Sequence, residues 1–230
     1  MKKTYTQSAE EVLRDLSVGA EGLTTAQAEE RLAKYGPNKL KEAEKPTLLQ
    51  RFIEQLKDPM LIILMVAAGV SALTGMLSGE PEWAEVIIIL IVVLLNAILG
   101  VFQESKAEAA IEALQTMTAA TCKVLRDGKM VVLHSTDLVP GDVVLLEAGD
   151  AVPADGRIIE NASLKIEEAA LTGESVPVNK MLEALGMADG QDEVPLGDRK
   201  NMCYMGSTVV YGRGKAVITT TGMDTEMGKI

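Results

Sequence analysis

Glu167-Glu-Ala-Ala-Leu-Thr-Gly-Glu-Ser-Val-Pro-Val-Asn-Lys180 is the stretch around which the rest of the sequence is organised. It holds a short polar loop, residues 172–175, between apolar flanks. Gly173 permits backbone conformations that other residues avoid and lets another surface approach closely. Glu174 presents a carboxylate at the tip of this loop, with a hydroxyl residue on either side of the Gly-Glu pair. Such a carboxylate can orient a water molecule against an electrophile held elsewhere, and the alternative is an ordinary surface turn.

The composition outside this loop favours a membrane protein with a water-soluble part. The chain has 230 residues, of which 47% are hydrophobic and 24% are charged. The net charge of −11 argues against a nucleic-acid partner. Cys122, Cys203 and the single histidine, His134, have no zinc-type spacing. We therefore expect two unpaired core thiols in a reducing compartment and no metal site.

Two small amphipathic helices are expected within residues 1–45. Ser8 with Glu11, and Thr24 with Gln27, have the spacing of capping boxes, each followed by an apolar edge at helical spacing. A basic, polar connector is expected next, carrying Lys39, Lys41, Lys45 and Arg51.

Two uncharged runs, about residues 60–77 and 86–102, predict a transmembrane hairpin within residues 46–117. A spanning helix needs about 20 predominantly apolar residues, so each run recruits its flanks. The alternative is a pair of buried helices in a soluble protein. Good helix formers continue from Gln103 to Met117, which predicts a stalk that leaves the membrane.

Charge around the hairpin predicts its orientation. Lys45, Arg51 and Lys57 precede the first span and Lys106 follows the second, whereas residues 78–85 between the spans carry no Lys or Arg. The positive-inside rule then places this acidic connector outside and both ends of the chain in the cytoplasm. We expect a multi-pass protein of the cell membrane.

Residues 118–221 read as a compact β-domain, a sandwich or a barrel. Two strands around Asp127-Gly128 predict a hairpin. Short strands between Gly, Pro and Asp turns are expected to follow at residues 143–146, 157–159, 203–205, 208–211 and 215–221, and residues 164–166 lead to the polar loop. Leu185 to Lys200 is expected to be a mobile acidic loop. Residues 222–230 look like the start of a further helix, which suggests a cut chain.

The chain resembles the N-terminal quarter of a type II P-type cation-transporting ATPase, most like the bacterial calcium-transporting ATPases. The resemblance rests on ordered motifs along nearly the whole sequence: Tyr35-Gly-Pro-Asn-Lys-Leu40, Lys57-Asp-Pro-Met60, Leu138-Val-Pro-Gly-Asp142, Gly149-Asp-Ala-Val-Pro-Ala-Asp155, Leu171-Thr-Gly-Glu-Ser-Val-Pro177 and Thr225-Glu-Met-Gly-Lys-Ile230. It implies a mixed α and β membrane protein. Its parts would be N-terminal helices, a two-helix transmembrane hairpin with a stalk, and an all-β actuator domain resembling a distorted jelly roll.

The resemblance also implies a chemistry. The family forms an aspartyl-phosphate from ATP, and the actuator loop hydrolyses it. By match to the motif, Glu174 would position the attacking water and Gly173 would allow close approach to the phosphorylated aspartate. Thr172 and Ser175 would shape the loop. ATP and magnesium would serve the complete pump, with neither bound by this part.

Several parts of such a pump have no counterpart in this sequence. It contains no Asp-Lys-Thr-Gly-Thr stretch, so we expect the chain alone to be inactive, without the phosphorylated aspartate, the nucleotide-binding domain and the later membrane helices. The expected partners are the lipid bilayer, the remaining domains of the pump and the transported cation. Calcium is the first choice of cation, with manganese, sodium/potassium and proton pumping open. The rival hypothesis is a complete two-span membrane anchor whose β-domain binds a partner protein.

Overall fold

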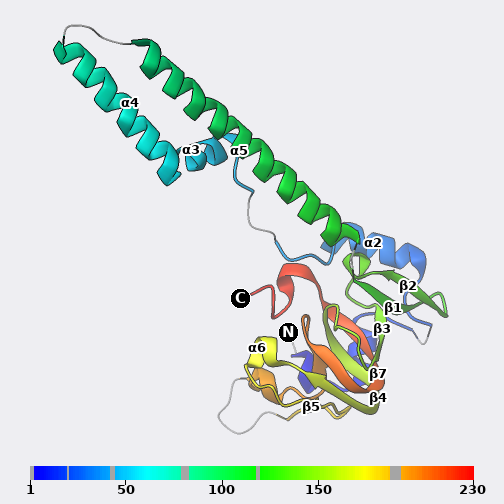
Figure 1. The fold of residues 1–230 in the computed structure, drawn as a ribbon. Coiled ribbons are helices and arrows are strands. Elements are labelled where there is room, and N and C mark those ends of the chain that lie inside the picture. The colour runs from blue at the N-terminus through cyan, green and yellow to red at the C-terminus, as the bar shows by residue number, and fades with distance from the viewer. Residues whose placement is uncertain (1–2, 20, 42–44, 79–82, 118–119, 187–192) are drawn as a thin grey trace. The chain divides into compact units, whose positions relative to one another are not determined.

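The computed structural model describes residues 3–19, 21–41, 45–78, 83–117, 120–186 and 193–230 (Figure 1). The chain divides into two compact units, one made of residues 1–42 with 119–230 and the other of residues 43–118. The first unit combines short helices with an antiparallel sheet and the second is helical, which confirms the mixed α and β class. The predicted domain boundaries at 1–45, 46–117, 118–221 and 222–230 stay predictions.

The N-terminal helices begin where their capping boxes predict. Helix α1 covers Ala9–Asp15 and helix α2 covers Thr25–Tyr35, after a short 3-10 helix, η1, at Thr4–Thr6. Ser8 and Glu11 cap each other reciprocally, and Thr24 and Gln27 do the same. Each box satisfies two backbone N–H groups that a helix N-terminus leaves unpaired.

The strands of the first unit form one antiparallel sheet. Its order is β2-β1-β3-β7-β4-β5, with β6 paired to β4. The strands are β1 Thr121–Arg126, β2 Lys129–His134, β3 Val143–Glu147, β4 Asp155–Glu167, β5 Val178–Asn179, β6 Met202–Cys203 and β7 Thr208–Thr220. The β1–β2 hairpin confirms the predicted turn, since Asp127 and Gly128 both have positive φ, as a two-residue hairpin turn of this kind requires. Within the described residues, short helices lie between strands at η2 Ser135–Asp137, α6 Ala169–Thr172 and η3 Leu196–Asp198, and η4 Gly222–Asp224 follows β7.

The strands predicted at 208–211 and 215–221 form one long strand, and the strand predicted at 157–159 continues to Glu167, so the prediction of short separate segments was wrong. β4 and β7 each run for 13 residues and pair with each other along most of their length. Gly212 and Ser163 have positive φ inside these strands, at an interruption of the register. A Cβ on Gly212 would lie 2.3 Å from the carbonyl oxygen of Ser163. These turn-like residues therefore mark a β-bulge where two backbones approach closely, and the strands continue through it.

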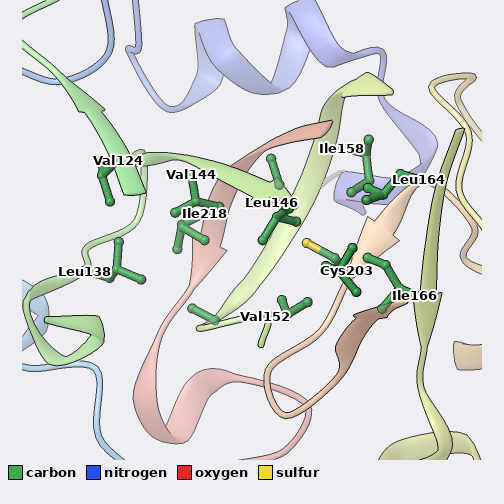
Figure 2. Close-up of a cluster of buried hydrophobic side chains, with 13 residues drawn as sticks. Val124, Leu138, Val144, Leu146, Val152, Ile158, Leu164, Ile166, Cys203 and Ile218 are labelled. Atoms are coloured by element: carbon green, nitrogen blue, oxygen red, sulfur yellow. The ribbon is translucent and has the colours of Figure 1, made fainter. Parts of the chain in front are cut away.

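One face of the sheet carries the main hydrophobic core. Alternate residues of the central strands point to it, such as Val144 and Leu146 of β3 and Ala216 and Ile218 of β7. Figure 2 shows side chains from β1, β3, β4 and β6 gathered in this cluster. Cys203 is fully buried within it, whereas Cys122 is only partly buried, and both thiols are free.

The opposite face of the same strands is covered by the N-terminal helices. Val143 and Val217, which alternate with the core residues just described, pack in a second cluster with residues of α1, α2 and the segment between them. The members contributed by the N-terminal segment are Val12, Val18, Leu23 and Ala28. A face that would otherwise expose apolar side chains to water is therefore closed by residues more than 100 positions away in sequence.

The described residues of the second unit form the helices α3 Leu48–Leu56, α4 Pro59–Ser78 and α5 Trp83–Met117. The prediction of a basic, polar connector was wrong at α3, because Thr47 and Gln50 form a third capping box and start a helix there. Arg51 lies buried on this helix and pairs with Glu108 of α5. The charge that we assigned to a connector therefore fixes α3 to the long helix.

Helices α4 and α5 are long and apolar enough to cross a membrane, which supports the predicted hairpin. Most of their apolar side chains are exposed, as expected of a surface that faces lipid. Helix α5 is continuous through the predicted stalk, from Trp83 to Met117. The connector between the two helices, residues 79–82, lies outside the described residues.

Two predictions concern the ends of the acidic segment and of the chain. The centre of the predicted mobile loop, residues 187–192, lies outside the described residues. After η4, the amide of Lys229 donates to the carbonyl of Thr225 at 3.2 Å, one helical turn. The predicted start of a further helix at this end stays a prediction.

Candidate functional site

The polar loop connects β4 to β5. The two strands pair at its base, where Ile166 lies opposite Val178. Between them the chain forms the single-turn helix α6, which ends at Gly173 with φ 74° and ψ −1°. The amide of Gly173 donates to the carbonyl of Ala169 at 2.9 Å. A left-handed glycine is a common end of a helix, so the sequence Leu-Thr-Gly turns the chain outward at this point.

The base of the loop is closed by a buried ion pair. The Nζ atom of Lys180 lies 2.5 Å from Oε1 of Glu168, and both side chains are at most 1% exposed. Burial raises the pKa of the Glu168 carboxyl, and the neighbouring ammonium of Lys180 opposes that shift. Lys180 is also held by its backbone, because its amide donates to Leu164 and its carbonyl accepts from the side chain of Asn161.

The tip of the loop is open. Residues 173–177 are all exposed. The Thr172 hydroxyl donates to the carbonyl of Glu168 at 3.0 Å and accepts the amide of Glu174 at 3.2 Å. The carboxylate of Glu174 makes no hydrogen bond or ion pair within the part of the chain that the structure describes. No described residue therefore occupies this carboxylate.

The space around Gly173 is empty as well. A Cβ placed on this residue would meet no atom within 4 Å. The glycine is therefore required here by its positive φ, and none of the described residues fills the space beside it. A carboxylate and an unobstructed backbone lie next to each other on an exposed turn, which suits close approach to a separate reacting group.

Comparison with known proteins places this chain in a family. The sequence model of the P-type ATPase actuator domain matches residues 116–230, and that of the cation transporter/ATPase N-terminus matches residues 4–71. The chain belongs to the P-type cation-transporting ATPases. The resemblance stated from the motifs is thereby confirmed.

Relatives of this chain extend over its whole length. It is 46% identical over 231 residues to calcium-transporting ATPase 1 of Bacillus cereus, covering 100% of this chain and 25% of that protein. It is 47% identical over 226 residues to a calcium-transporting ATPase of Listeria monocytogenes, covering 98% and 24%. A cation-transporting ATPase of Synechocystis is 43% identical over 223 residues, covering 96% and 23%. The chain thus spans about a quarter of the length of these relatives.

The four predicted site residues of the actuator domain are consecutive, and the structure places them at the end of α6 and in the exposed turn after it. Thr172 lies at the inner end with its hydroxyl bonded to backbone, whereas Gly173, Glu174 and Ser175 are exposed. Their roles stay predictions. Glu168 was not singled out as a site residue, and neither was Lys180. The sequence does carry a signal for Lys180, since it is the only Lys or Arg between Lys165 and Arg199 in an acidic stretch.

The aspartates of two other family motifs hold turns in place. The buried Asp142 accepts the amide of Val139 at 2.9 Å and two hydrogen bonds from Arg126. Asp155 accepts the amides of Met205 and Glu226. Both carboxylates are occupied by protein groups, so neither is free for chemistry.

A buried arginine links the N-terminal segment of this chain to the loop side of the sheet. Arg157 of β4 is fully buried, and its guanidinium donates to four backbone carbonyls. Those carbonyls belong to Gln7, Ile158, Leu182 and Asn201. Burial lowers the pKa of Arg157 to about 10, so the guanidinium keeps its charge at neutral pH. The Arg157 guanidinium thereby links Leu182, in the segment that follows Lys180, to Gln7, which lies before α1.

Proposed function

We propose that the chain is the N-terminal part of an ATP-driven cation pump that works through an aspartyl-phosphate. In this proposal the loop at residues 172–175 hydrolyses the phosphoenzyme. The observation that carries the proposal is the free, exposed carboxylate of Glu174 beside an unobstructed glycine, on a loop whose base is buried. The phosphorylated aspartate would come from the rest of the full-length pump, because the sequence has no Asp-Lys-Thr-Gly-Thr stretch.

Glu174 would act on water. An acyl phosphate is already reactive, so holding the attacking water in line supplies much of the rate. The carboxylate would orient that water and accept its proton as the new bond to phosphorus forms. Gly173 would admit the phosphorylated group to within reach of the carboxylate, and Thr172 and Ser175 would shape the turn.

ATP and magnesium would serve the complete pump. Within the described residues, no three His, Cys, Asp or Glu side chains gather where a metal ion could bind. We assign no residue of this chain to either group. ATP-dependent phosphorylation would depend on domains beyond this sequence.

Calcium is the cation we propose. Support comes from the Bacillus and Listeria relatives, which are named as calcium-transporting ATPases. The Synechocystis relative is named only for cation transport, so manganese, sodium/potassium and proton pumping are outcomes of the test. Phosphorylation of the full-length pump from ATP should require micromolar calcium, and phosphorylation that requires another cation would reassign the ion.

We further propose that both ends of the chain face the cytoplasm. Basic residues flank the hairpin on one side only, which supports this orientation in the cell membrane. A single cysteine placed at Ser78, with Cys122 and Cys203 changed to serine, should react with an impermeant thiol reagent on intact cells. Labelling only after lysis would reverse the orientation.

The role of Glu174 is tested with Glu174→Gln in the full-length pump. The amide keeps the shape and loses the base, and general-base help contributes about 10²–10⁴-fold. We expect normal phosphorylation from labelled ATP and a slower decay, by up to that factor, after excess unlabelled ATP is added. Glu160→Gln is the matched control, because Glu160 is an exposed carboxylate of β4 away from the loop. Decay of Glu174→Gln at the wild-type rate would refute the role.

A further inference from the structure

The Glu168–Lys180 ion pair lies at the two ends of the loop, in the interior of the actuator domain. Glu168 directly precedes α6 and Lys180 directly follows β5. The pair therefore links the residue just before the loop to the residue just after it. No side chain of the pair reaches the exposed tip, since both are buried.

A short series of contacts connects the pair to Glu174. The carboxylate of Glu168 contacts Lys180, and the carbonyl of the same residue accepts the Thr172 hydroxyl at 3.0 Å. That hydroxyl in turn accepts the amide of Glu174 at 3.2 Å. A displacement of Glu168 would therefore displace the Thr172 hydroxyl and, with it, the backbone amide of Glu174.

A buried ion pair is not the most stable way to close a loop. Removing two charges from water costs free energy, and an apolar pair of similar volume often stabilises a protein as well or better. In addition, Oε2 of Glu168 has no hydrogen-bond partner among the described residues, so this carboxylate depends on Lys180 alone. What an ion pair adds over an apolar pair is a fixed distance between two points, here 2.5 Å between Nζ and Oε1.

We propose that Glu168 and Lys180 are positioning residues, whose buried ion pair sets the location of the Glu174 backbone for attack on the phosphoenzyme. The proposal rests on the proposed function of the loop. Neither residue touches the reacting atoms. They act through Thr172, so their loss should slow hydrolysis of the phosphoenzyme while its formation from ATP persists.

The experiment uses Lys180→Met and the double variant Glu168→Gln/Lys180→Met in the full-length pump. Lys180→Met leaves a buried carboxylate without its partner, whereas the double variant removes both charges and keeps similar volumes. Lys215→Met is the matched control, since Lys215 makes the same type of pair with Glu160 on the exposed part of β4. Phosphoenzyme level and decay are measured for each, beside Glu174→Gln.

We expect both loop-base variants to reach the wild-type phosphoenzyme level and to lose it about 10-fold or more slowly, within the about 10²-fold that a 1 Å misplacement can cost. The control should decay as wild type. If Lys180→Met does not fold, the double variant decides: slow decay supports positioning, and wild-type decay overturns it. If Glu174→Gln is slow and the loop-base variants are not, only this inference fails. If Glu174→Gln itself decays normally, the proposed function fails.

Discussion

The loop between β4 and β5 has a base and a tip that differ in almost every physical respect. At the base, a carboxylate and an ammonium are buried and bonded to each other. At the tip, five consecutive residues are exposed and the carboxylate of Glu174 has no partner in the described chain. Buried charges at the base depend on their pairing, whereas the tip contributes few contacts to the fold.

Within 13 residues, the base of the loop is therefore expected to determine stability and the tip to determine the chemistry. Changes at the base should alter the free energy of unfolding, and through it the position of the loop. Side-chain changes at the tip should leave the folded chain intact and alter what happens when another domain approaches, whereas Gly173 also contributes to stability through its left-handed backbone. Four substitutions, at Lys180, Gly173, Thr172 and Val176, compare the loss of stability along the loop.

Lys180→Ala should have the largest effect of the four. It leaves the buried carboxylate of Glu168 uncompensated, and breaking a buried pair in this way costs about 3–5 kcal/mol. Cys203 offers a reporter, because it is fully buried in the sheet and burial raises the pKa of its thiol to about 12. Its reaction with a thiol reagent therefore requires opening of the domain. Labelling of Cys203 against urea concentration gives the free energy of unfolding.

Lys215→Ala is the control for that measurement. Its ion pair with Glu160 is exposed, and such pairs contribute about 0–1 kcal/mol. Equal urea midpoints for the two alanine variants would mean that the buried ion pair contributes no more to stability than the exposed one.

Local patterns in the sequence predicted the helix starts and the hairpin, because each of those features depends on residues three or fewer positions apart. The capping box at Ser8 and the Asp127-Gly128 turn are of this kind. The same rule could have found α3, whose box at Thr47 was overlooked. The Thr172–Ser175 loop was found by its motif, and its exposure followed from its turn residues.

Features that depend on tertiary register could not be read from the sequence. Glycine at position 212 looks like a strand end, and only the neighbouring backbone of Ser163 makes it a bulge within β7. The pairing of Glu168 with Lys180 requires β4 and β5 to align first. The cover of Val143 and Val217 by the N-terminal helices joins residues far apart in sequence and carries no local signal.

Gly173→Ala should have the second largest effect. A left-handed backbone costs a residue with a Cβ about 1–2 kcal/mol, and no clash is added, because the Cβ would meet no atom within 4 Å. Gly212→Ala is the matched control with nearly the same φ, where the Cβ would lie 2.3 Å from a backbone oxygen. Urea unfolding of both variants should show the larger loss at Gly212. Equal losses would mean that the space beside Gly173 is filled.

Thr172→Val should destabilise less. It removes the hydroxyl that links Glu168 to Glu174 and keeps the shape of the side chain. A hydrogen bond contributes about 0.5–1.5 kcal/mol net, and water can replace it on the exposed side. Thr172→Ser retains the hydroxyl and should unfold close to wild type. Equal destabilisation by valine, which lacks the hydroxyl, and by serine, which lacks only the methyl group, would mean that the hydroxyl link contributes no more to stability than the methyl group does.

Val176→Ser should have the smallest effect, although it replaces an apolar side chain by a smaller, polar one. Its side chain is 75% exposed, and surface substitutions usually fall within about 0.5 kcal/mol of zero. Val178→Ser, two residues on, is the matched control at the base, because Val178 is half-buried in β5 opposite Ile166. The two substitutions are chemically identical, so any difference in urea midpoint reports only their position. A clear loss at Val176 would show that the tip packs against part of this chain, and Glu174 would then not be free to meet a group from another domain.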